Sequence, residues 1–278
     1  IWLSPKQGTD AALAMACGHV ILKEFYIDRQ AAYFQDYARK YTDMPMLVRL
    51  VQKDGRLVPD RLLRASDFVG GLDEQNNPEW KTVAIDGKTG NIVCPRGSIG
   101  FRWGEQGKWN LEERAGNGVE TELALTLKGR EDHLASVAFP YFGNRKHDHF
   151  HGTEHADILE RKIPVRKLQL ADGETLVASV FDLFVANYGV DRGFAGDTVG
   201  KSYDSDAPYT PAWQEAITGV PRDKVIAVAR AFADNAEKTH GKSMVIVGAG
   251  LNHWYHMDMN YRGIINMLVM CGCVGQSG

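Results

Sequence analysis

The chain has 278 residues, of which 44% are hydrophobic, 24% charged and 10% aromatic, and its formal net charge is -3. These values are those of an ordinary globular protein, so disorder, collagen and coiled coil are excluded as descriptions of the whole chain. No run reaches the roughly 18 to 20 apolar residues of a membrane-spanning helix, and no signal-peptide pattern opens the sequence. The near-neutral charge argues against a nucleic-acid partner, which normally meets a basic stripe.

Both ends of the sequence are unusual for natural termini, which are mostly polar. The chain opens on the apolar residues Ile1, Trp2 and Leu3, and it stops at Gly278 shortly after an apolar helical pattern. We therefore expect an internal fragment of a longer protein.

The first forty residues follow the pattern of a strand, a loop and a helix. Residues 1–3 are typical of a strand end, a turn with proline and glycine follows, and Thr9 or Asp10 caps a helix predicted from Ala11 to about Phe25. Such units build α/β folds, and their loop and helix N-terminus are where anions and nucleotides bind.

From about residue 41 to residue 180 the pattern changes to short β-like runs. Residues 82–85 and 91–93, for example, flank a turn that begins with Asp86 and Gly87, which predicts a hairpin. This middle part is interpreted as a β-rich, loop-rich insertion.

The last hundred residues return to an α/β pattern. A helix is predicted after Pro221, the apolar run 243–247 is typical of a buried parallel strand, and a second helix is predicted over 258–271. The apolar positions that define the two helices are Val225, Val228, Ala229 and Phe232 in the first and Ile264, Ile265, Leu268 and Cys271 in the second.

One segment between the predicted strand and the last helix could carry chemistry. Gly248 and Gly250 would let the backbone approach a phosphate closely, although the third glycine of a dinucleotide fingerprint is replaced by His253. An imidazole in such a loop could donate to an oxyanion or shuttle a proton. The alternative is a histidine that only bonds to backbone in a buried loop.

Two other clusters fail the tests for a metal site. Residues 147–155 offer four imidazoles and two carboxylates, but without metal-ligand spacing, so a solvated loop is favoured. The four cysteines lack C-x-x-C spacing and are interpreted as packing residues in a reducing compartment. They are Cys17, Cys94, Cys271 and Cys273.

Taken together, several segments resemble one family closely. The sequence is similar, in order and over essentially its whole length, to the α (catalytic) subunits of membrane-bound respiratory nitrate reductases, which are molybdopterin oxidoreductases. The segments that carry the resemblance are residues 5–12, 77–81, 97–104, 209–213, 217–220, 247–256 and 271–278.

The resemblance implies a fold, a cofactor and an activity. The fold would be α/β, with parts of two Rossmann-like molybdopterin-binding domains (residues 1–40 and a truncated 181–278) around the β-rich insertion at 41–180. The cofactor would be molybdenum held by two molybdopterin guanine dinucleotides, and the reaction would reduce nitrate to nitrite. Electrons would come from quinol through iron-sulphur clusters.

The resemblance also implies partners and a location. These are an iron-sulphur β subunit and a membrane cytochrome b γ subunit, which would hold the α subunit peripherally at the cytoplasmic face of the cell membrane. The ligands of the subunit's [4Fe-4S] cluster and the aspartate that coordinates molybdenum would lie outside this sequence. No residue here is therefore assigned as a metal ligand, and the isolated fragment is expected to be inactive.

Site residues follow from the matching motifs. One dinucleotide would be held by Gln7, Gly8, Thr9 and Asp10, and the second cofactor contact would involve Gly248, Gly250, Leu251, Asn252 and His256. The carboxylate of Asp10 suits guanine, whose N1 and N2 edge donates two hydrogen bonds. His253 would lie nearest the metal and orient a nitrate oxygen or supply a proton, with its order relative to His256 left open.

Three other functions stay open from the sequence. An enzyme of the same clade could act on chlorate, selenate or a related substrate. The α/β pattern alone would also fit a non-catalytic nucleotide-binding module, and the histidine-rich run would fit a metallohydrolase.

Overall fold

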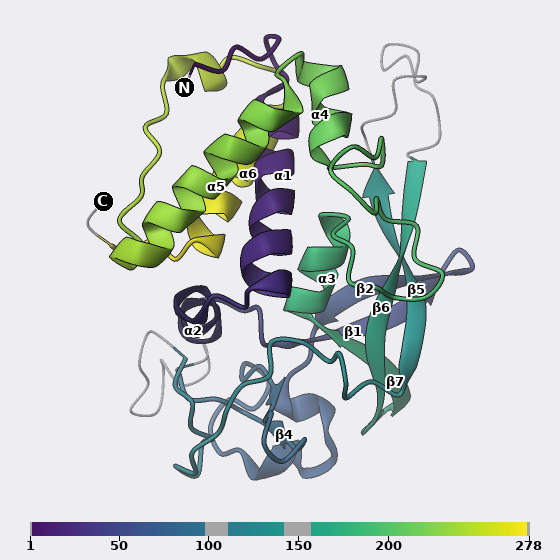
Figure 1. Cartoon of the computed structure of the whole chain (residues 1–278). Coiled ribbons are helices and arrows are strands. Elements are labelled where there is room, and N and C mark those ends of the chain that lie inside the picture. The colour runs from purple at the N-terminus through teal and green to yellow at the C-terminus, as the bar shows by residue number, and fades with distance from the viewer. Residues whose placement is uncertain (1, 98–110, 142–156, 277–278) are drawn as a thin grey trace. The chain divides into compact units, whose positions relative to one another are not determined.

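The computed structural model describes residues 2–97, 111–141 and 157–276 of the chain. Their contacts divide the chain into two compact units (Figure 1). The helical unit consists of Ile1–Ala38, Tyr188–Gly193 and Val199–Gly278, and the barrel unit consists of Arg39–Asn187 and Phe194–Thr198. The beginning and the end of the chain, which the sequence assigned to two different domains, thus group as one unit by contact. Their assignment to separate domains of a longer protein stays a prediction.

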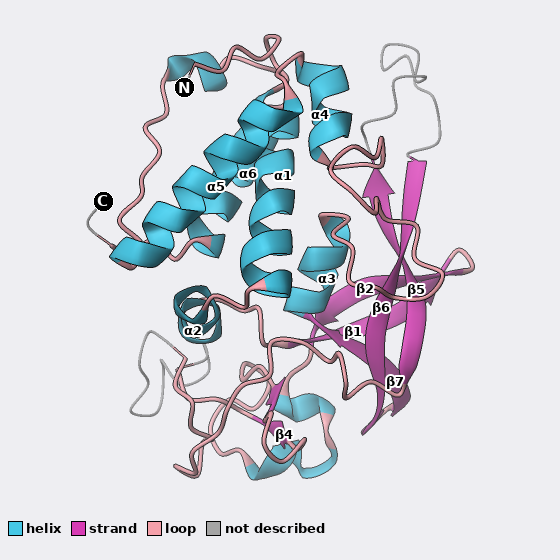
Figure 2. Cartoon of the chain, viewed as in Figure 1, coloured by secondary structure: helices cyan, strands magenta, loops and turns pink. Residues whose placement is uncertain are grey.

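The helical unit is built around helix α1 (Figure 2). Its helices are α1 (Asp10–Ile21), the π-helical turn η1 (Leu22–Asp28), most of α2 (Ala32–Tyr41), α4 (Pro211–Thr218), α5 (Arg222–Thr239), the 3-10 turn η6 (Ala249–Leu251) and α6 (Met257–Met270). Helix α1 contacts α4, α5 and α6. Within α1, Ala16, Val20 and Ile21 have no exposed surface.

Capping residues and a proline set the start of α4, the end of α4 and the start of α5. The Thr210 hydroxyl accepts from the N–H of Trp213 at 3.2 Å and caps α4, which Gly219 ends in the left-handed conformation at φ 77°. Helix α5 follows Pro221, as the sequence predicted, and buries Val225 and Ala229 completely.

Helices α1 and α6 run parallel and in contact. At their N-terminal ends the Asn260 Oδ1 accepts from the Ala11 N–H at 2.9 Å. Further along, a Cβ on Gly263 would lie 2.8 Å from the Ala14 Cβ, and at the C-terminal ends a Cβ on Gly18 would lie 3.1 Å from the Met270 Cε. Both helices therefore begin at the same end of the unit.

The buried face of α6 differs from the predicted one. It consists of Asn260, Gly263, Met267 and Met270, whereas Ile265 is 50% exposed. The predicted stripe took the most apolar residues, but at Gly263 the approach of α1 leaves no room for a side chain, since a Cβ there would lie 2.8 Å from the Ala14 Cβ. Of the predicted positions, only Cys271 is fully buried.

Strands in the described residues lie between Leu47 and Ser179. A closed sheet has the order β1-β2-β5-β6-β7 and a second sheet pairs β3 with β4. The strands are β1 (Leu47–Lys53), β2 (Arg56–Leu62), β3 (Ala84–Ile85), β4 (Ile92–Val93), β5 (His133–Tyr141), β6 (Asp157–Leu170) and β7 (Gly173–Ser179), and β7 leads into helix α3 (Val180–Asn187). Two 3-10 turns, η2 (Ala65–Asp67) and η3 (Val69–Asp73), follow β2.

The closed sheet is mostly antiparallel. Its hairpin between β1 and β2 turns on Asp54 and Gly55, both with positive φ (51° and 74°), which matches the twist of the flanking strands. The parallel pair among the described strands joins β2 and β5 through Leu57 and Val137. The chain thus mixes helices with a small closed sheet.

Two predicted strands, one before α1 and one before η6, are absent from the described residues. Residues 2–6 and 242–248 have no regular structure. Met244 and Ile246 are 62% and 84% exposed. A strand persists only where a neighbouring strand supplies its backbone hydrogen bonds, and none of the described segments does so here.

Among the described residues, no helix combines the length and the apolarity needed to cross a membrane.

The predicted hairpin around Asp86 is confirmed, with β3 antiparallel to β4. The Asp86 carboxylate accepts from the Thr89 hydroxyl at 2.6 Å and from the Glu122 N–H at 2.9 Å. Burial alone raises the pKa of this carboxyl, but these hydrogen bonds outweigh burial and hold the pKa below its ordinary value.

We expect Asp86→Asn to lower the free energy of unfolding by about 1–2 kcal/mol at pH 7. Because the folded-state pKa is depressed, the carboxylate stabilises the fold above its unfolded pKa of about 3.9. That contribution disappears as the pH falls through the folded value. Denaturant unfolding at neutral pH and below about pH 3 should show the two proteins converging in acid. A difference that stays constant with pH would contradict this role.

Candidate functional site

A cleft of about 520 Å³ in the helical unit joins the two loops that precede α1 and α6. It is lined by Pro5, Lys6, Gln7, Asp10, Ile246, Val247, Gly248, Gly250, Leu251 and Trp254. Five of the residues predicted for the cofactor site are in this lining: Gln7, Asp10, Gly248, Gly250 and Leu251. Segments some 240 residues apart in sequence therefore share one cleft.

The first loop is held tightly by its own backbone. The Thr9 hydroxyl donates to the Lys6 carbonyl at 2.5 Å, and the Lys6 N–H donates to the Thr218 carbonyl at 2.9 Å. Gly8 has φ 77°, and a Cβ there would lie 3.5 Å from the Trp254 ring. Trp254, from the second loop, therefore packs directly over the first.

Three polar side chains of this loop face the cleft without partners among the described residues. Asp10, Gln7 and Lys6 line the cleft, and their side chains make no hydrogen bond or ion pair there. They offer a carboxylate acceptor, an amide and an ammonium donor. Sequence reasoning missed Lys6, although its place beside Gln7 could have indicated it.

The N-terminus of α1 offers fewer free amides than the sequence suggested. The Ala11 N–H donates to Asn260 and the Ala12 N–H donates to the Thr9 carbonyl at 3.0 Å. Anion binding at a helix N-terminus needs unpaired N–H groups. A ligand in this cleft would therefore meet the loop side chains rather than free amides of the helix end.

The second loop contains two glycines that nothing in the described chain requires. A Cβ on Gly248 or Gly250 would meet no atom within 4 Å, and Gly248 has an ordinary φ of -113°. The loop tightens into η6, where the Leu251 N–H donates to the Gly248 carbonyl at 3.2 Å. The glycines thus leave open space beside the cleft.

The remaining predicted residues of the second loop lie close to the lining residues Leu251 and Trp254 in sequence but are not part of the lining. Asn252, His253 and His256 are exposed. The rings of Tyr255 and His256 meet edge to face at 4.6 Å. His253 directly precedes the lining residue Trp254 but is not part of the lining itself.

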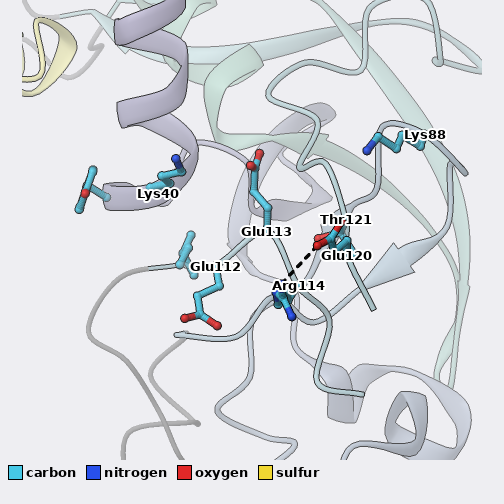
Figure 3. Close-up of a pocket in the computed structure, with 9 residues that line it drawn as sticks. Lys40, Lys88, Glu112, Glu113, Arg114, Glu120 and Thr121 are labelled. Atoms are coloured by element: carbon cyan, nitrogen blue, oxygen red, sulfur yellow. Dashed lines mark hydrogen bonds and ion pairs between the residues drawn. The ribbon is translucent and has the colours of Figure 1, made fainter. Parts of the chain in front are cut away.

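A larger cavity, of about 580 Å³, lies in the barrel unit and contains none of the predicted site residues (Figure 3). Its walls carry both signs of charge, and Arg114 pairs with Glu120 at 3.2 Å. Glu112 and Glu113 come from the same stretch, and Lys40 comes from the end of α2 (Figure 3). Mixed and partly paired charges select no particular ligand, so cavity size alone does not identify the site.

The cysteines are packing residues, as predicted. All four are buried, and burial raises the pKa values of Cys17 and Cys94 to about 12, so neither is a thiolate at neutral pH. The histidine-rich run at 147–155 and most of the motif at 97–104 lie outside the described residues.

The sequence model of the family "Molybdopterin oxidoreductase" matches residues 1–278. Two relatives from Escherichia coli K12, the respiratory nitrate reductase 1 and 2 alpha chains, are 60% and 61% identical to this chain over its whole length. The nitrate reductase alpha chain of Bacillus subtilis 168 is 43% identical, again over the whole chain. The chain spans 22% of the length of each of these relatives.

The family match covers the segments at both ends of the sequence and the β-rich part between them. The resemblance inferred from the motifs is therefore confirmed. The chain belongs to the molybdopterin oxidoreductase family.

Proposed function

We propose that this chain is part of the catalytic α subunit of a respiratory nitrate reductase, which reduces nitrate to nitrite with electrons from quinol. The main support for this proposal is that the whole chain is 60% identical to a respiratory nitrate reductase alpha chain. Its partners would be an iron-sulphur β subunit and a cytochrome b γ subunit, with the assembly at the cytoplasmic face of the membrane. A [4Fe-4S] cluster in the same subunit would be held by residues outside this chain.

The cleft supports a molybdopterin guanine dinucleotide as cofactor. Its unpaired side chains match the groups of guanine and phosphate: Asp10 can accept from the guanine N1 and N2 edge, and Gln7 and Lys6 can donate to the base carbonyl or to phosphate. The open space beside Gly248 and Gly250 suits a bulky group close to the backbone.

Each residue then has a proposed task. Thr9 would fix the first loop through its bond to Lys6, and Gly8 would supply the left-handed φ of 77° in that loop. Leu251, Asn252 and His256 would contribute to the second cofactor contact. When bound, the cofactor supplies a two-electron oxygen-atom transfer, for which the protein provides orientation and electrostatics.

His253 is proposed to act on nitrate itself. Its imidazole is exposed and forms no hydrogen bond within the described residues. It could therefore donate a hydrogen bond to a nitrate oxygen or deliver a proton as that oxygen leaves. This role predicts a variant that keeps its cofactor but loses turnover.

The Rossmann-like fold of the parent domains also stays a proposal. The run from Met244 to Val247 is apolar, has no regular secondary structure and forms no backbone hydrogen bond in the described residues. We propose that it becomes a parallel strand when the rest of the protein supplies its neighbours. Hydrogen exchange of the full-length enzyme should then show these amides protected as strongly as those of α1. Exchange at the rate of an open loop would contradict the strand.

The function is tested on the full-length enzyme with its partner subunits. Molybdenum and guanine nucleotide should be present, and nitrate should be reduced with quinol as donor. A loaded enzyme that reduces chlorate or selenate but not nitrate would move the assignment to another member of the clade. A full-length protein without molybdenum would favour a non-catalytic nucleotide-binding module.

A further inference from the structure

The first turns of α1 and α6 are joined by one buried side chain. Asn260 lies in the first turns of α6, is 1% exposed, and accepts the Ala11 N–H of α1 through its Oδ1 at 2.9 Å. Ala11 follows Asp10 directly, and Asn260 follows Trp254 by six positions. This hydrogen bond therefore connects the helices that follow the two loops of the cleft.

No other group replaces this bond among the described residues. Thr9, the residue at the cap position of α1, makes no side-chain bond to the helix, because its hydroxyl donates back to Lys6. The Ala11 amide thus depends on Asn260 for its acceptor. Without it, a part-buried N–H at the start of α1 would lose its acceptor within the described residues, which costs free energy.

Burying the polar amide of Asn260 costs free energy that a residue needed only for packing would not require. Its Nδ2 is buried and has no hydrogen-bond partner among the described residues. The neighbouring contacts of α6 with α1 use small or apolar residues, such as Gly263 against Ala14. An apolar side chain of similar volume would fill the space without an unpaired donor, so packing alone does not explain an amide here.

We infer that Asn260 is a positioning residue of the cofactor site, which holds the two cofactor loops in register through its bond to the first turn of α1. The inference rests on the proposed function and adds to it a residue that touches neither cofactor nor substrate. Binding groups must be held to within about 0.5 Å for full effect. Since α1 and α6 are parallel, a slip at their N-terminal ends moves Asp10 relative to Gly250.

The test uses the full-length enzyme isolated from cells that supply the cofactor. The readouts are molybdenum per protein, guanine nucleotide released on denaturation, and Tm. Asn260→Leu, which keeps the volume but removes the acceptor, should lower both occupancies by roughly five- to tenfold. Asn260→Asp, which keeps the acceptor, should retain more than half of the wild-type occupancy.

Met267→Ala is the matched control. Met267 lies on the same buried face of α6 and is 8% exposed, so its truncation loosens the α1–α6 contact without touching the Ala11 amide. It should lower Tm at least as much as Asn260→Leu yet keep most of the cofactor. The inference would be overturned if Met267→Ala lost as much cofactor as Asn260→Leu, or if Asn260→Leu kept wild-type occupancy. It would also be overturned if Asn260→Asp had an occupancy as low as that of Asn260→Leu. A wild-type enzyme that holds neither molybdenum nor guanine nucleotide would instead refute the proposed function.

Discussion

Replacing Asp10 by Leu is expected to empty the cofactor site of the full-length enzyme. The carboxylate lines the cleft and has no partner among the described residues, so its acceptors are available to a ligand. Hydrogen bonds to a charged group are worth about 1.5–3 kcal/mol each. Loss of two of them would weaken retention of guanine nucleotide by roughly 10² to 10⁴-fold. Quantifying nucleotide and molybdenum in the purified variant checks the expectation.

Asp223→Leu is the control for this variant. Asp223 also stands in the first turn of a helix, α5, and is exposed, but it is not part of the cleft lining. Both variants lose a carboxylate that favours the helix dipole, so their stabilities should fall by similar small amounts. Only Asp10→Leu should lose the cofactor. Full occupancy in Asp10→Leu would remove Asp10 from the site.

Unlike Asp10→Leu, the variant His253→Gln should keep its cofactor but lose activity. Because His253 lies beyond the lining, cofactor content should stay near that of the wild type. The kcat for nitrate should fall by about a hundredfold or more if the imidazole delivers a proton. Unchanged kcat in a fully loaded variant would leave His253 without a catalytic role.

The second large effect concerns stability. Asp182→Ala should destabilise the barrel unit by about 3–5 kcal/mol, because three donors, two of them buried, lose their acceptor at once. The Asp182 carboxylate is fully buried and accepts from the Thr126 hydroxyl at 2.6 Å, the Leu127 N–H at 2.7 Å and the Ser179 hydroxyl at 2.8 Å. These bonds tie the start of α3 to the segment before β5. Denaturant unfolding should show the loss directly.

Asp172→Ala provides the comparison. Asp172 pairs with Arg49 at 2.8 Å, but its side chain is 57% exposed. An exposed ion pair contributes at most about 1 kcal/mol, so this variant should unfold close to the wild type. Similar losses in the two variants would mean that burial of Asp182 is not what makes its hydrogen bonds important.

The sequence determined the local elements well where the chain itself supplies the signals. Periodic apolar residues predicted α5, and the turn at Asp86 predicted the β3–β4 hairpin. The motifs at the two ends identified the family, because their residue types and spacing can be recognised without knowledge of the fold. These features are local, and their physical causes lie within a few residues of each other.

Only the tertiary structure decided which of these pieces meet. It brought Asp10 and Gly250 to one cleft, rotated α6 so that Asn260 and Gly263 face α1, and left residues 243–247 without the neighbours that a strand requires. The positions of apolar residues could not have predicted the buried face of α6, because the contact between α6 and α1 depends on how closely the side chains fit as well as on their hydrophobicity. Hydrogen bonds such as that from Ala11 to Asn260 join residues 249 positions apart, and no local pattern encodes a partner at that distance.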